Sequence, residues 1–167
     1  MENNKTKKIV MASMFAALCC VATMIIKIPS PLKGYLNLGD CIVLLSGFML
    51  SPLFGFLAAG IGSALADLFA GYIVYAPATF VIKGAMALIA YFGFKFLHKT
   101  AGTTPSRIVS AIVAEIVMVG GYFVFEGFMY GFLPSAVNIP ANAVQGVAGI
   151  ILGVILAKIF DKGFNLK

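Results

Sequence analysis

One long apolar stretch decides how many helices this chain contains. Residues 41–94 read CIVLLSGFMLSPLFGFLAAGIGSALADLFAGYIVYAPATFVIKGAMALIAYFGF, with Asp67 and Lys83 as the charged positions. A helix needs about 20 apolar residues to cross a bilayer, so the stretch could form two long spans or three shorter ones. Turn signals at 51–52 and 71–77 divide it into three, of which the first is short.

The composition of the whole chain is that of a membrane protein. Its 167 residues are 61% hydrophobic and 11% charged, with a mean hydropathy of +1.03. A typical soluble chain is about 25% charged. The net charge of +6 is scattered and forms no basic helix face, which excludes a nucleic-acid-binding protein. The cysteines lie in apolar runs without a CxxC spacing, and we expect neither a metal site nor a cofactor.

The distribution of basic residues favours three spans in 41–94. The total is then six, and both termini and the loop 96–106 lie on one side of the membrane. Nine of the 12 basic residues fall on that side, within or next to these segments. We therefore predict a single domain, 1–167, that is an all-α integral protein of the cell membrane with six transmembrane helices and cytoplasmic N- and C-termini. The expected helices are about 8–27, 40–51, 54–70, 76–96, 107–130 and 137–160.

Polar residues inside these spans gather in the outer half, and such residues are usually functional because they are costly in lipid. Asn138, Asn142 and Gln145 share one face of the last helix. Glu115 alone lies in the inner half. The sequence predicts a pocket that opens to the outside beneath the loop 27–39. The candidate substrate-binding residues are Asn37, Asp40, Asp67, Tyr75, Lys83, Tyr122, Glu126, Asn142 and Gln145.

Lys83 is the most informative of these residues, since a lysine this deep in the membrane needs a partner. We expect it to contact Asp67, Glu126 or a ligand. A polar network that holds no ligand is the alternative interpretation. Tyrosines near the outer ends of the helices would suit stacking on a planar ring; they are Tyr72, Tyr75 and Tyr122.

Small residues recur at helical spacing and allow helix backbones to approach closely in lipid. The first helix carries Ala12 and Ala16, and one residue further on Ser13 and Ala17. A longer stripe of this kind is Ala58, Gly62, Ala66 and Ala70. Such faces either pack the helices of the chain together or dock a second membrane protein.

Several short motifs, taken in their order and spacing, resemble a known family. They are GYLNLGD at 34–40, SALAD at 63–67, YAPAT at 75–79, IKG at 82–84, Glu115 with GYFVFE at 121–126, and NAVQG at 142–146. Together they are similar to the substrate-binding (S) component of energy-coupling factor (ECF) transporters, in its riboflavin-type group, which includes hydroxymethylpyrimidine- and pyridoxine-type members. The resemblance covers about residues 8 to 160.

This resemblance implies a function and partners. An S component has no catalytic activity; it captures a vitamin or precursor from outside, here a pyrimidine- or pyridine-type ring such as hydroxymethylpyrimidine or pyridoxine, or riboflavin. It delivers its substrate with a transmembrane coupling subunit and two ATPase subunits. The Ala-xxx-Ala of the family's first helix meets the coupling subunit, and Ala12 and Ala16 match it. ATP hydrolysis by other subunits fits the lack of a GxxxxGK[ST] motif in this chain.

Two functions of other classes stay open on the residues alone. One is a small dimeric secondary transporter that couples to protons through Glu115 and Glu126. The other is an accessory membrane subunit that binds no small molecule. ATP-dependent uptake separates the S component from the first, and a bound vitamin separates it from the second.

Overall fold

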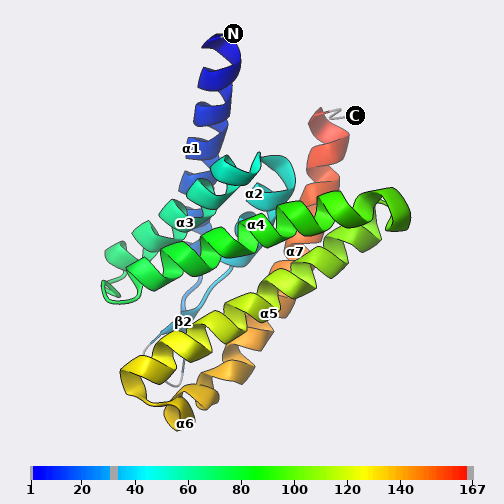
Figure 1. Ribbon diagram of the computed structural model, residues 1–167. Coiled ribbons are helices and arrows are strands. Elements are labelled where there is room, and N and C mark those ends of the chain that lie inside the picture. The colour runs from blue at the N-terminus through cyan, green and yellow to red at the C-terminus, as the bar shows by residue number, and fades with distance from the viewer. Residues whose placement is uncertain (1, 31–33, 165–167) are drawn as a thin grey trace.

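The computed structural model describes residues 2–30 and 34–164, and this part of the chain is almost entirely helical (Figure 1). In chain order the elements are α1 (Glu2–Ile25), β1 (Ile28–Pro29), β2 (Tyr35–Leu36), α2 (Gly39–Met49), α3 (Pro52–Phe69), α4 (Ala76–Ala101), α5 (Thr103–Tyr130), the short α6 (Phe132–Ser135), a 3-10 turn (Ala136–Asn138) and α7 (Ile139–Phe164). The predicted all-α architecture with six principal helices is confirmed; these are α1 to α5 and α7.

Five segments of the described chain are long and apolar enough to cross a membrane: α1, α3, α4, α5 and the continuous stretch of α6 and α7. The sixth helix, α2, has 11 residues and spans about 16 Å, roughly half of the hydrocarbon core. It is enclosed by α1, α3, α4 and α7, and its side chains at Val43, Leu44 and Leu45 are fully buried. Neighbouring helices, not lipid, therefore surround the short helix.

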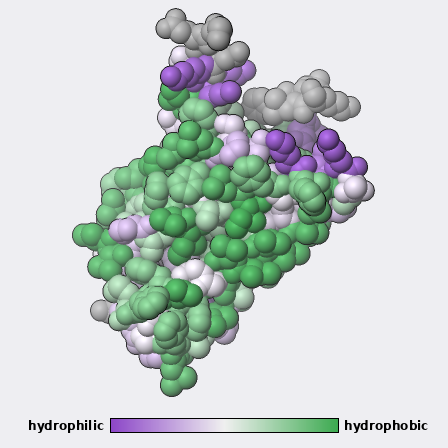
Figure 2. Space-filling model, viewed as in Figure 1, coloured by the Kyte–Doolittle hydropathy of each residue, from purple (hydrophilic) through white to green (hydrophobic). Residues whose placement is uncertain are grey.

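The surface is consistent with a bilayer around the bundle. Large apolar side chains are exposed along α1, α3, α4, α5 and α7. Figure 2 shows hydrophobic residues over most of the visible face, with hydrophilic residues gathered where α1 begins and α7 ends. These two ends lie at the same end of the molecule (Figure 1), as the predicted six-helix topology requires. That this end is cytoplasmic stays a prediction of the charge distribution.

Local signals set the helix boundaries. Ser51 is extended, and Pro52 occupies the first turn of α3, where its missing N–H costs no hydrogen bond. Between α4 and α5 the expected loop 96–106 is instead helical up to Gly102 and again after it. Gly102 has a φ of +79°, which glycine adopts readily. Charged residues need water but not irregular backbone, so both helices continue beyond the bilayer.

The arrangement of helices determines where the polar residues meet. α3 packs against both α1 and α4, α4 also packs against α5, and α7 packs against α2 and α5. Between α1 and α2 the chain forms a two-stranded antiparallel ladder that pairs Ile28 with Leu36 and Pro29 with Tyr35. β2 lies away from the two termini (Figure 1); it carries Tyr35, and Asn37 directly follows it in the chain.

Candidate functional site

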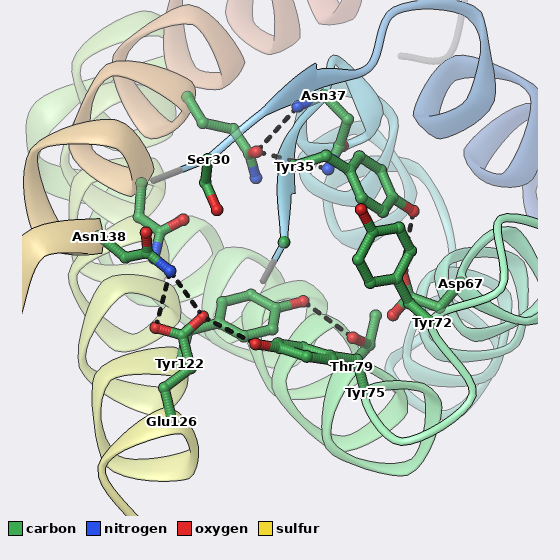
Figure 3. A pocket seen from close by; sticks show the side chains of 13 residues that line it. Ser30, Tyr35, Asn37, Asp67, Tyr72, Tyr75, Thr79, Tyr122, Glu126 and Asn138 are labelled. Atoms are coloured by element: carbon green, nitrogen blue, oxygen red, sulfur yellow. Dashed lines mark hydrogen bonds between the residues drawn. The ribbon is translucent and has the colours of Figure 1, made fainter. Parts of the chain in front are cut away.

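A polar pocket lies beneath the hairpin, among the ends of α3 and α5 and the beginnings of α4 and α7 (Figure 3). Its cavity measures about 40 Å³, room for about three water molecules. The lining residues are Ser30, Gly34, Tyr35, Asn37, Asp67, Tyr72, Tyr75, Thr79, Tyr122, Glu126, Asn138, Asn142 and Gln145. Segments far apart in the sequence thus contribute to one small polar space.

Asp67, near the end of α3, is one of two carboxylates at this pocket. It accepts a hydrogen bond from the Tyr35 hydroxyl at 2.8 Å and another from Thr79. The Tyr122 hydroxyl in turn donates to Thr79 Oγ1 at 3.1 Å. The pKa of the Tyr35 phenol is raised, mainly because the phenol is buried and secondly because the Asp67 carboxylate is close to it. Tyr35 therefore stays a neutral donor. Asp67 is thereby held by hydroxyl groups.

Glu126, near the end of α5, is the second carboxylate. The Asn138 amide donates to both of its oxygens at 3.0 Å, and the Tyr75 hydroxyl approaches Oε1 at 3.4 Å. Glu126 is 3% exposed. Like Asp67, it accepts hydrogen bonds from neutral side chains.

Aromatic rings form one wall of the pocket. The ring centroids of Tyr35 and Tyr72 are 5.0 Å apart, and those of Tyr72 and Tyr75 are 6.1 Å apart. Tyr75 also packs edge-on against Phe125, with centroids 5.3 Å apart. These distances lie in the range of favourable aromatic pairs. The wall offers flat apolar surface next to the two carboxylates, which suits a planar polar ring.

A chain of polar contacts lies directly below the pocket. Lys83 of α4 forms a buried ion pair with Asp40 of α2. Gln145 of α7 donates to Asp40 Oδ2 at 2.7 Å, and its own Oε1 accepts the backbone N–H of Asn37 at 2.9 Å. Four segments are therefore connected, from α4 through α2 and α7 to the hairpin that covers the pocket.

All of the predicted substrate-binding residues line the pocket except Asp40 and Lys83. Lys83 contacts Asp40, not the expected Asp67 or Glu126. Lys83 lies one helical turn after Thr79, which lines the pocket, so its side chain is deeper and meets the beginning of α2. Whether the lining residues bind a substrate stays a proposal.

Some lining residues were not among the candidates taken from the sequence. The hairpin contributes Ser30 and Tyr35, and Thr79 lies on the face of α4 that reaches the pocket. Tyr35 belongs to the quoted motif at 34–40, but no polarity pattern marks a two-residue ladder. Asn138 shares a helical face with Asn142 and Gln145, and that spacing was the available signal for it.

A second, apolar feature is an open groove along α1 and α3. Its lining residues are Ile9, Ala12, Ser13, Ala16, Ala17, Cys20, Val21, Phe54, Leu57, Ala58, Ile61, Leu65 and Phe69. A methyl group placed on Gly62 of α3 would lie 2.3 Å from the Ala16 carbonyl oxygen. The two backbones therefore touch beside Ala16, and Ala12 is buried, whereas Ser13 and Ala17 are exposed. The small-residue face of α1 is thus divided between an internal contact and an open surface.

One family model and two curated proteins match most of this chain. The model of the ECF-type riboflavin transporter S component matches residues 3–162. A Pyrococcus woesei protein described as an uncharacterized protein in the gap 3′ region is 39% identical over 145 residues, which is 85% of this chain and 93% of that protein. The thiamine precursor transporter HmpT of Lactococcus lactis subsp. cremoris is 26% identical over 164 residues, covering 97% of this chain and 92% of HmpT.

A solved structure supports the same assignment. It was described under the words "Structure and mechanism of the S component of a bacterial ECF transporter". The two chains superpose with a TM-score of 0.77 and are 27% identical, with 98% of this chain and 99% of that one covered. The family match spans nearly the whole chain and the fold agrees with it, so this protein belongs to the family of riboflavin-type S components of ECF transporters, which are transport components and not enzymes.

Proposed function

We propose that this S component captures a single-ring vitamin precursor with amino or hydroxyl donors, of the pyrimidine or pyridine type, from outside the cell membrane. The observation that carries the proposal is the pair of pocket carboxylates, Asp67 and Glu126, held by neutral donors. Among the 13 lining residues, all in the described part of the chain, none is basic. A neutral or cationic donor ligand therefore finds acceptors, whereas an anionic ligand is repelled.

The shape of the pocket favours one ring over a flavin. The cavity of about 40 Å³ must widen for any ring to enter, and a pyrimidine or pyridine requires far less displacement than three fused rings. An aminopyrimidine has an amino group beside a ring nitrogen. When that nitrogen is protonated, two parallel N–H donors match the two oxygens of a carboxylate. The name of the Lactococcus relative, a thiamine precursor transporter, supports the same class.

Isothermal titration calorimetry on the purified protein tests the substrate class. We expect hydroxymethylpyrimidine or pyridoxine to bind more tightly than riboflavin. The phosphate ester of hydroxymethylpyrimidine should bind far more weakly than the alcohol, because its charge faces both carboxylates. Riboflavin as the tightest ligand, or equal affinity for the phosphate ester, would contradict the proposal. Mass spectrometry of any ligand carried through purification gives an independent identification.

The groove along α1 and α3 is the surface that we assign to the transmembrane coupling subunit, which would act with two ATPase subunits. It is open, apolar and rich in small residues, which suits close packing of a second membrane helix. The exposed Ala17 lies in it. Ala12 and Ala16, which match the family motif, line the same groove from the side that contacts α3.

Reconstituted vesicles test the partner assignment. Ala17→Leu should leave ligand affinity of the isolated protein unchanged and abolish ATP-dependent uptake. The matched control is Gly120→Leu, because Gly120 is exposed on α5 with nothing within 4 Å of an added methyl group; its uptake should be normal. Lost affinity in Ala17→Leu would mean that this face packs internally. Uptake driven by a proton gradient without ATP would favour the dimeric secondary transporter.

A further inference from the structure

Glu115, in the middle of α5, is buried outside the pocket. Its side chain is 4% exposed, and neither of its carboxyl oxygens has a hydrogen-bond partner within residues 2–30 and 34–164. Asp67 and Glu126, by contrast, are both held by donors. An ionised carboxylate without donors is very costly away from water. Glu115 therefore needs a further ligand or a different protonation state.

Two glycines of α7 make the space that Glu115 occupies. A methyl group on Gly146 would lie 3.1 Å from Glu115 Oε2, and one on Gly149 would lie 2.7 Å from Oε1. The same methyl group on Gly149 would lie 2.8 Å from Cβ of Asp40. The carboxyl group of Glu115 and the side chain of Asp40 thus lie side by side against the same stretch of α7.

The charged and titratable groups that face Glu115 come from two neighbouring helices. Asp40 and Cys41 belong to α2 and Lys83 to α4, and all three interact electrostatically with Glu115. The third neighbour, α7, presents the uncharged Gly146 and Gly149. Lys83 already donates to Asp40. With both carboxyls ionised and the thiol neutral, the cluster has a net charge of −1 in the membrane interior; one proton makes it neutral.

We propose that Glu115 is a proton-binding site beneath the substrate pocket and that its carboxyl group is protonated, and therefore neutral, in this structure. When Glu115 loses its proton, its carboxylate competes with Asp40 for the ammonium group of Lys83. The consequence reaches the pocket, because Asp40 also accepts from Gln145, and Gln145 accepts from Asn37 of the hairpin. A proton on Glu115 thus keeps Lys83 on Asp40 and supports the contacts that hold the hairpin over the pocket.

Infrared spectroscopy tests the protonation directly. The chain has six acidic residues, so a protonated carboxyl band is readily assigned. At neutral pH the wild type should show the C=O stretch of a protonated acid that shifts in deuterium oxide, and Glu115→Gln should lack this band. As a control, Asp161→Asn should retain it, because Asp161 lies far from Glu115 in the chain and pairs with Arg107 at 2.6 Å. A spectrum without the band, or a band unchanged in Glu115→Gln, overturns the proposal.

The pH dependence of stability gives a second readout, measured by reversible unfolding in mixed detergent micelles. Folded Glu115 keeps a proton that the unfolded chain releases above about pH 4.3. Stability therefore falls as pH rises, by about tenfold in the folding equilibrium constant per pH unit, until folded Glu115 itself ionises. Glu115→Gln has a side chain of the same shape that does not titrate, so its stability lacks this pH dependence. The ratio of the wild-type folding constant to that of Glu115→Gln should therefore fall about tenfold per pH unit. A constant ratio between about pH 6 and about pH 8 contradicts the site.

The effect on the pocket rests on the proposed function and is measured separately. Ligand dissociation from the wild type should accelerate as pH rises, whereas dissociation from Glu115→Gln should depend less on pH. If the infrared band is present but no pyrimidine or pyridine binds at any pH, the proton site stands and the proposed substrate fails. If the ligand binds with identical pH profiles in both proteins, the link from Glu115 to the hairpin is wrong.

Discussion

The contact between α1 and α3 and the interior between α4, α5 and α7 are stabilised by different interactions, although both lie within the same bilayer. In the first, Gly62 brings the α3 backbone against the Ala16 carbonyl. In the second, polar side chains such as Glu126 and Asn138 pair with each other. Lipid provides little hydrophobic drive for helix association, so close backbone packing and buried polar pairing are the two available means.

This difference also separates the two proposed interactions of the protein. Close packing of small residues leaves an apolar groove that another membrane helix can extend. Polar pairing leaves acceptors in a small enclosed space, which suits a soluble ligand. If the comparison is right, substitutions in the two regions should affect different properties.

The largest effect is expected in the polar interior, for Lys83→Met. The substitution keeps the length of the side chain but leaves Asp40 without its buried partner. We expect a loss of about 3–5 kcal/mol in the free energy of unfolding, measured in mixed detergent micelles. Adding Asp40→Asn should restore much of it, since no charge is then left unpaired. Normal stability with lost ligand binding would instead place Lys83 in contact with the ligand.

Glu126→Gln should act on binding. It removes the negative charge at the pocket and retains a side chain of the same shape. We expect affinity for an aminopyrimidine to fall by a charge-assisted hydrogen bond, about 1.5–3 kcal/mol, or roughly 10- to 150-fold, by calorimetry. The thermal midpoint should change little. If affinity is unchanged, Asp67 is the carboxylate that contacts the ligand, and Asp67→Asn should then show the loss.

Gly62→Ala tests the close contact of α1 with α3. The added methyl group would lie 2.3 Å from the Ala16 carbonyl oxygen and 2.7 Å from Cβ of Cys19, so the helices must separate. We expect a loss of about 1–3 kcal/mol in unfolding free energy, with ligand affinity nearly unchanged. The control is Gly120→Ala, where an added methyl group meets nothing within 4 Å. Equal effects in the two variants would disprove a specific backbone contact.

Tyr35→Phe should have the smallest effect. It removes one hydroxyl that donates to Asp67 at 2.8 Å and leaves the ring packed against Tyr72. A neutral hydrogen bond contributes about 0.5–1.5 kcal/mol, so ligand affinity should fall by about tenfold at most. A much larger loss, measured by the same calorimetry, would show that the phenol contacts the ligand itself.

Much of this site was accessible from the sequence because charge inside a membrane is rare and costly. Asp67 and Glu126 interrupt apolar runs, and the spacing of Asn142 and Gln145 placed them on one face. Partners were not accessible in this way. Lys83 pairs with Asp40 because the two side chains lie at the same depth once the helices are packed. The hydropathy pattern of a sequence does not give the depth of a side chain in the packed bundle.

Hydropathy and the positions of charged residues were enough to predict the class of the protein, the number of principal helices and the end of the bundle at which polar groups gather. The reason is that lipid excludes unpaired polar groups and hydrocarbon thickness sets helix length. Which polar groups meet was set by the tertiary structure. It enclosed the short α2, folded the hairpin that carries Tyr35, and placed Glu115 in a glycine-lined space beside Asp40. The burial of α2, the position of the hairpin and the surroundings of Glu115 all depend on the distances between helices. Those distances arise from side-chain packing between segments that are far apart in the chain.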